Sequence, residues 1–103
     1  MSAGQFMARL AQPAPVVLVD VREAWELEVA SVPVKIVHIP LGQLSQRLQE
    51  LDPATETVVL CRSGGRSGQA AHFLDNQGFK SVHNLKGGIL AWAQELDPTI
   101  PAY

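Results

Sequence analysis

The sequence predicts an α/β fold with a single parallel β-sheet of about four to five strands and helices on both faces. Short β-branched runs alternate with helical stretches of roughly ten residues, the pattern of parallel strands linked by helical crossovers. Residues 16–19 (Val-Val-Leu-Val) are apolar without alternation, which is typical of a strand buried on both faces. The 103 residues are expected to form one domain, 1–103, with a substantial core.

Apolar spacing and helix-breaking residues define the predicted elements. Apolar residues three or four apart predict helices, and prolines at 13, 40 and 53 end the preceding segments. Leucines at 41, 44, 48 and 51 fall on one helical stripe. Gly78 is well placed for a left-handed helix cap. The predicted order is a helix over 6–11, a strand over 16–19, a helix over 23–29, a strand over 36–39, a helix over 41–51, a strand over 57–60, a helix over 67–77, a strand over 81–83 and a helix over 89–96.

Both tryptophans lie on apolar helical faces and are predicted to be core residues. Trp25 shares its face with Val29, and Trp92 belongs to the last helix. Trp92 is also a candidate for one wall of a pocket.

Composition excludes several classes of function. The formal net charge is −2 and no Lys/Arg-rich stretch exists, which argues against nucleic-acid binding. One cysteine cannot form an intramolecular disulfide. No apolar run approaches the roughly 20 residues of a membrane span, and the start lacks the pattern of a signal peptide. A cytoplasmic monomer that does not contact a membrane is therefore expected.

The single cysteine, Cys61, directly follows the predicted strand over 57–60. The next residues are Arg-Ser-Gly-Gly-Arg, and a helix is predicted to begin at about Arg66 or Ser67. A strand would thus deliver a thiol into a tight turn, where backbone N–H groups and the positive end of a helix point at one sulfur atom. Such surroundings favour the nucleophilic thiolate. A free cysteine is usually a small buried hydrophobic residue, but these polar neighbours are a poor setting for one.

The residues after Cys61 are candidates for binding a substrate. Glycines let the backbone curl around the sulfur and adopt dihedrals that other residues resist. Arginines add positive charge, which attracts an anion and favours the thiolate. The candidate substrate-binding residues are Arg62, Ser63, Gly64, Gly65 and Arg66.

Four segments in order make the chain similar to a single-domain rhodanese, a sulfurtransferase. They are Val-Asp-Val-Arg-Glu at 19–23, His-Ile-Pro-Leu at 38–41, the loop from Cys61 to Ser67, and Gly-Gly-Ile-Leu-Ala-Trp at 87–92. The resemblance implies a rhodanese-like fold and a sulfane sulfur carried as a persulfide on Cys61. It implies no metal and no organic cofactor. The implied donor is thiosulfate or a related anion, and the acceptor is cyanide or a thiol, including a protein thiol.

The same resemblance implies residues that support the loop, namely Asp20, Arg22, Ser67, Gly87 and Gly88. Asp20 and Arg22 would brace the loop through hydrogen bonds and an ion pair. The simpler interpretation is that Asp20 caps the following helix while Arg22 is exposed, and the two interpretations are compatible. Gly87 and Gly88 would let the last helix approach the loop closely.

Three other functions remain open at this point. Cysteine phosphatases and arsenate reductases of similar fold place five residues between cysteine and arginine; here four separate Cys61 from Arg66, and Ser67 stands where they need arginine. A persulfide carrier would expose Cys61 to a partner's thiol. A non-catalytic interaction module usually lacks the cysteine. The histidines at 38, 72 and 83 have no metal-ligand spacing.

Overall fold

The sheet has four parallel strands and helices on both faces, as predicted. The computed structural model describes all residues, 1–103. Its elements are α1 (Ala3–Leu10), β1 (Val16–Asp20), α2 (Ala24–Val29), β2 (Val37–His38), the 3₁₀ segments η1 (Leu41–Gln46) and η2 (Leu48–Glu50), β3 (Glu56–Leu60), α3 (Gly65–Asn76), β4 (Val82–Asn84) and α4 (Gly88–Glu95). The strand order is β2-β1-β3-β4, with all pairs parallel.

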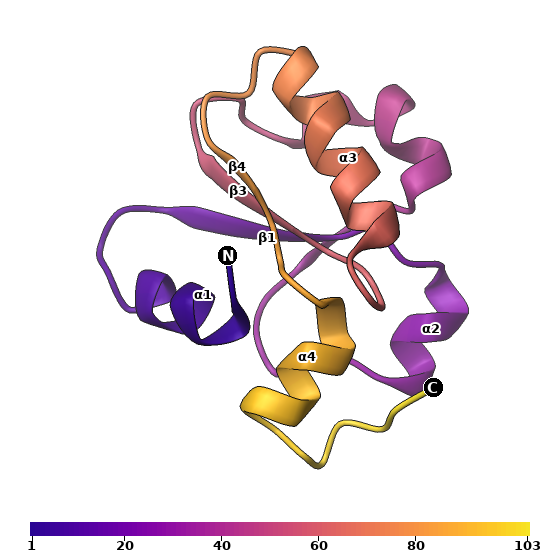
Figure 1. Cartoon of the computed structure of the whole chain (residues 1–103). Helices are drawn as coiled ribbons and strands as arrows, with labels where there is room; N and C mark the ends of the chain where they lie inside the picture. Colours follow the sequence, from indigo (N-terminus) through magenta and orange to yellow (C-terminus); the bar gives the residue numbers. More distant parts are fainter.

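Two apolar clusters fill the space between sheet and helices, one on each face. Leu18 and Val58 project toward α1 and α4, where Phe6 and Trp92 pack 5.8 Å apart between ring centroids. Neighbouring residues of the same strands, such as Val59, project toward α3 and η1. Figure 1 shows α3 on one side of the strands and α1 with α4 on the other. The continuous apolar runs of β1 and β3 are therefore buried on both faces.

The helix predicted over 41–51 is wrong. The structure has two short 3₁₀ segments there, separated at Arg47, whose φ of −120° and ψ of 20° are not helical. Of the leucine stripe only Leu44 is completely buried. Gly42 and Ser45 have low helix propensity, and so little burial does not offset it.

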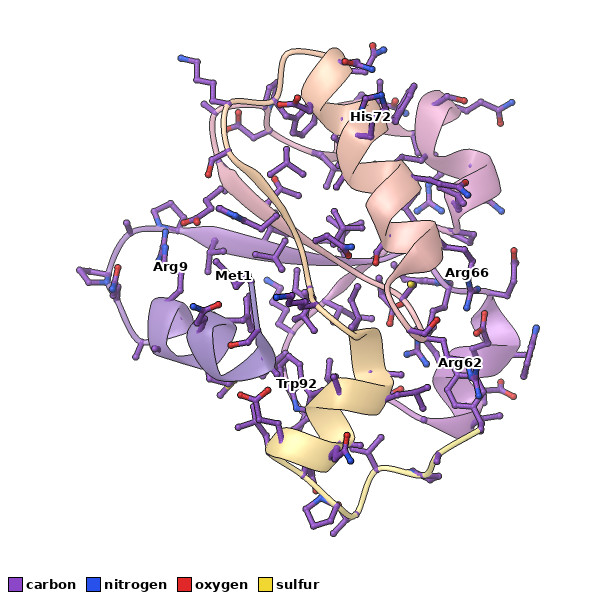
Figure 2. All side chains as sticks on the ribbon, viewed as in Figure 1. Met1, Arg9, Arg62, Arg66, His72 and Trp92 are labelled. Atoms are coloured by element: carbon purple, nitrogen blue, oxygen red, sulfur yellow. The ribbon has the colours of Figure 1, made fainter.

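Trp25 was predicted to be core, and this is also wrong. Its exposed fraction is 60%, and that of Val29 is 42%, because α2 has only six residues and buries Glu26 instead. Trp92 is 1% exposed and is a core residue. It projects from α4 toward α1 (Figure 2) and packs in the apolar cluster on that face of the sheet.

The sheet register brings the candidate residues to one edge. Asp20 at the end of β1 pairs with Leu60 at the end of β3, so Cys61 follows directly beside it. The carboxyl ends of parallel strands are where such folds place their sites. None of the helices has the length and apolar character needed to cross a membrane. Nowhere do three or more His, Cys, Asp or Glu side chains gather as they would around a metal ion.

Candidate active site

Cys61 leaves β3 and starts a tight loop into α3; we call residues 61–66 the Cys61 loop. Gly64 is the N-cap of α3 and has a φ of +107°, a left-handed conformation that glycine adopts without steric cost. Gly65 has no positive φ, so its predicted special dihedral is absent. A Cβ on Gly65 would meet no atom within 4 Å, so the space beside this part of the loop is open.

Two groups hold the Cys61 sulfur. The Gly64 N–H donates to Sγ at 3.0 Å, and the Ser67 hydroxyl oxygen lies 3.2 Å from Sγ. Burial raises the pKa of the Cys61 thiol, but hydrogen bonds from the Ser67 side chain and from the N–H groups of Ser67, Gly64 and Ser63 outweigh it, so the pKa lies below its ordinary value. The pocket around the sulfur therefore favours the thiolate.

The sulfur is also part of the core. Cys61 is 1% exposed and packs with the apolar residues under α3. The thiol therefore lies at the floor of the loop, and the exposed thiol expected for a persulfide carrier is not present in this conformation.

Asn84 at the end of β4 fixes the inner side of the loop, and the sequence interpretation missed it. Ser67 Oγ lies 2.5 Å from Asn84 Oδ1 and 3.2 Å from Cys61 Sγ, and its single proton can be donated to only one of them at a time: Asn84 Oδ1 accepts it beside the protonated thiol, and the Cys61 thiolate accepts it after ionisation. Asn84 Nδ2 donates to the Gly64 carbonyl oxygen at 3.1 Å. One amide thus orients the Ser67 hydroxyl beside Cys61 and ties the loop to the sheet. The available signal was its position, since Asn84 ends a strand at the same edge as Asp20.

Arg66 points toward α2. Its Nη1 and Nη2 donate to the two Glu26 carboxylate oxygens at 2.6 and 2.8 Å. These bonds, against the effect of burial, lower the pKa of Glu26 to about 2, and the pKa of Arg66 is raised. Glu26 was also missed, because a lone glutamate on a short helix resembles an ordinary solvent-exposed charge.

Asp20 and Arg22 form a completely buried ion pair. Arg22 Nη2 lies 2.8 Å from Asp20 Oδ2, and both side chains are at most 1% exposed. The predicted helix cap by Asp20 is wrong, because Glu23 is the N-cap of α2 and closes a capping box with Glu26. The prediction of an exposed Arg22 is also wrong, because the Arg22 guanidinium is buried, where it is paired with the Asp20 carboxylate.

The buried pair reaches the Cys61 loop through other residues. Neither Asp20 nor Arg22 hydrogen-bonds to residues 61–66; Arg22 Nη1 instead donates to the Tyr103 hydroxyl at 2.9 Å. Arg62 Nε donates to the Tyr103 carbonyl oxygen. Figure 2 shows Arg62 and Arg66 on the same side of the molecule, beside α2.

Gly87 and Gly88 bring the start of α4 against the loop. A Cβ on Gly88 would lie 2.5 Å from the Cys61 carbonyl oxygen, and both residues have positive φ, of 75° and 63°. The N–H of Ile89 donates to the Cys61 carbonyl at 2.9 Å, and that of Leu90 to the Arg62 carbonyl at 3.1 Å. The predicted close approach is present.

Fold and site together define a class of protein. A parallel α/β sheet presents a buried thiol at the N-terminus of a helix, and hydrogen bonds rather than a histidine base stabilise its thiolate. The chain belongs to the rhodanese-like domain family, whose model matches residues 2–95.

Three curated relatives illustrate the similarity. A chloroplastic rhodanese-like/PpiC domain-containing protein of Arabidopsis thaliana is 48% identical over 90 residues, which are 84% of this chain but only 30% of that protein. A protein of Allochromatium vinosum named sulfurtransferase is 38% identical over 89% of this chain and 85% of its own length. A Bacillus subtilis protein named provisionally as a sulfur carrier, YrkF, is 44% identical over 73% of this chain and 40% of its own length.

Solved structures have the same fold. A rhodanese-related protein of Thermoplasma volcanium superposes with a TM-score of 0.84 at 26% identity, covering 100% of this chain and 97% of the other.

Proposed function

We propose that the protein transfers sulfane sulfur through a persulfide on Cys61, with thiosulfate or a related anion as donor and cyanide or a thiol as acceptor. The observation that carries the proposal is the hydrogen-bonded sulfur at the start of α3, with N–H and O–H groups at 3.0 and 3.2 Å. These groups lower the pKa of the thiol against the effect of its burial. Relatives named sulfurtransferase and sulfur carrier support it.

The reaction consists of two displacements at sulfur. The Cys61 thiolate attacks the outer sulfur of thiosulfate, the S–S bond of thiosulfate breaks, and sulfite leaves with the bonding electron pair. The terminal sulfur of the resulting persulfide carries the negative charge, which the N–H groups of residues 62–66 stabilise. Cyanide then attacks that terminal sulfur, and the persulfide S–S bond breaks. Thiocyanate leaves and the Cys61 thiolate is restored, which gives double-displacement kinetics.

The orientation of Arg66 argues against phosphatase chemistry. A phosphatase arginine must turn toward the bound phosphate, whereas both terminal nitrogens of Arg66 are bonded to Glu26. Ser67, at the position where a phosphatase needs its arginine, contacts the sulfur instead. The four intervening residues after Cys61 make a loop suited to a single sulfur atom.

Intact-mass measurement tests the proposal. Wild type incubated with thiosulfate is expected to become heavier by one sulfur atom, and cyanide is expected to discharge that sulfur as thiocyanate. Cys61→Ser is the matched control and should gain no mass. Failure of wild type to gain sulfur would exclude thiosulfate as the donor.

A persulfide carrier that exchanges sulfur with a partner protein is the second candidate. The relative named as a sulfur carrier favours it. Saturation by small donors at micromolar to low millimolar concentrations favours the enzyme over the carrier. Absence of saturation, with fast transfer to a protein thiol, favours the carrier. In either case the donor and the acceptor must gain access to Cys61, which is 1% exposed.

A further inference from the structure

We propose that Tyr103 is a positioning residue for the anion-attracting arginines of the Cys61 loop. It links the buried Asp20–Arg22 pair to both Arg62 and Arg66, and thereby sets how strongly the loop attracts an anionic donor. The inference rests on the proposed function for its choice of donor, but its test does not.

The Tyr103 hydroxyl joins two ion pairs. It accepts a hydrogen bond from Arg22 Nη1 and donates one to Glu26 Oε1, each at 2.9 Å. The Glu26 carboxylate in turn holds both Nη atoms of Arg66. Through one hydroxyl, the buried Arg22 is therefore linked to the carboxylate that orients Arg66, whose side chain is 35% exposed.

The rest of Tyr103 holds Arg62. The Tyr103 carbonyl oxygen accepts from Arg62 Nε, and the Arg62 guanidinium carbon lies 5.2 Å from the centroid of the Tyr103 ring. That separation is within the range of a cation–π contact. No hydrogen bond occupies the Nη atoms of Arg62, so they remain available to an anion.

The segment that carries Tyr103 is anchored. Ile100 is 8% exposed and packs into the same apolar cluster as Trp92. The chain then crosses to α2, and its end lies beside that helix (Figure 1). There the Tyr103 ring contacts Trp25 edge to face, with 6.2 Å between centroids. This contact also accounts for a large aromatic residue on the exposed face of α2.

The arrangement has a chemical consequence. Thiosulfate is a dianion that must approach a thiolate, so its approach depends on compensating positive charge at the loop. Two unit charges about 4 Å apart in water-like surroundings attract each other by about 1 kcal/mol. Moving one positive charge from that distance into solvent therefore lowers the rate at which the anion approaches by about fivefold. Tyr103 controls the position of two such charges.

Alkylation with two reagents tests this directly. The rate constants of Cys61 with anionic iodoacetate and neutral iodoacetamide are measured for wild type, Tyr103→Phe and Tyr103→Ala. The iodoacetate-to-iodoacetamide ratio is expected to fall about fivefold in Tyr103→Ala, which loses both the ring and the hydroxyl, and by less in Tyr103→Phe, which keeps the ring beside Arg62. Lys80→Gln removes an exposed charge at the opposite end of the sheet and should leave the ratio unchanged.

A double mutant identifies the path of the effect. In an Arg62→Gln background, Tyr103→Ala should lower the ratio by less than it does in wild type, because part of its action passes through that arginine. An unchanged ratio in Tyr103→Ala overturns the proposal. A loss of both alkylation rates in the same proportion also overturns it, because such a loss indicates only that the thiolate is less populated or that the fold is disrupted. Full additivity with Arg62→Gln also overturns it. If thiosulfate loads no sulfur on wild type, the proposed function fails while this ratio still tests Tyr103.

Discussion

Replacing Gly88 with alanine should separate α4 from the Cys61 loop. A methyl group at this position would lie 2.5 Å from the Cys61 carbonyl oxygen and from the Arg62 carbonyl carbon. Both neighbours are backbone atoms, so no flexible side chain can move aside. The start of α4 must shift, and with it the hydrogen bonds from α4 to the Cys61 and Arg62 carbonyls.

The expected cost of Gly88→Ala is about 3 kcal/mol of the free energy of unfolding. The φ of +63° costs a residue with a Cβ about 1 kcal/mol. Loss of the two hydrogen bonds from α4 adds about 1 kcal/mol each. For a domain whose total stability is about 5–15 kcal/mol, this is a large fraction.

Urea unfolding of three glycine variants separates the contributions. Gly78 has a φ of +89° with open space around it, so Gly78→Ala should cost about 1 kcal/mol, from backbone strain alone. Gly42→Ala has neither strain nor a neighbour within 4 Å and should cost nothing measurable. If Gly88→Ala is no more destabilising than Gly78→Ala, the close approach of α4 does not contribute to stability and the reasoning is refuted.

Three further substitutions test the polar contacts of the site. Ser67→Ala should raise the pKa of Cys61, because a hydrogen bond that lowers this pKa is lost. If that hydrogen bond is worth about 1 kcal/mol, the rate of alkylation by iodoacetamide at neutral pH falls about fivefold. An unchanged pH profile of alkylation would contradict this. Glu26 has its pKa lowered from 4.5 to about 2, so its contribution is complete above pH 4.5 and lost as the pH falls toward 2. The free energy of unfolding of wild type exceeds that of Glu26→Gln, and this difference should therefore shrink by about 2 kcal/mol on acidification. Urea titrations that give the same difference at neutral and acidic pH would refute the prediction. Asp20→Ala leaves the buried Arg22 without its carboxylate partner and should cost about 3–5 kcal/mol in the same assay; a cost below 1 kcal/mol would show that water reaches Arg22.

Local patterns made much of the fold predictable. The apolar run of β1 and the strand that precedes Cys61 are both predicted as strands, since each is short and rich in β-branched residues. Parallel strands then require Asp20 and Cys61 to share an edge. The leucine stripe over 41–51 led to a wrong helix prediction. Periodicity indicates which residues could share a buried helical face, but the fold buries only Leu44 of these leucines completely.

The side-chain partners around the sulfur could not be predicted in the same way. Tyr103 contacts Arg22 and Glu26 across 81 and 77 positions of the chain, and no periodic pattern relates such residues. The burial of Trp25 depends on which segment packs against its face of α2. Trp25 contacts the Tyr103 ring rather than the sheet. Asn84 was detectable only by its place at the end of β4, a boundary that sequence patterns locate poorly.

The burial of Cys61 among core residues makes the thermostability of the protein a reporter of its chemistry. The sulfur packs with the apolar cluster beneath α3 while the Gly64 N–H and the Ser67 hydroxyl hold it. A group that is bound more tightly by the folded state than by the unfolded chain stabilises the folded state. The stabilisation equals the difference between the two binding free energies. Ionisation, alkylation or sulfur loading at Cys61 each alters how that atom fits this packing. A melting curve therefore distinguishes empty from loaded protein without any coloured substrate, and it does so for donors whose identity is not known in advance.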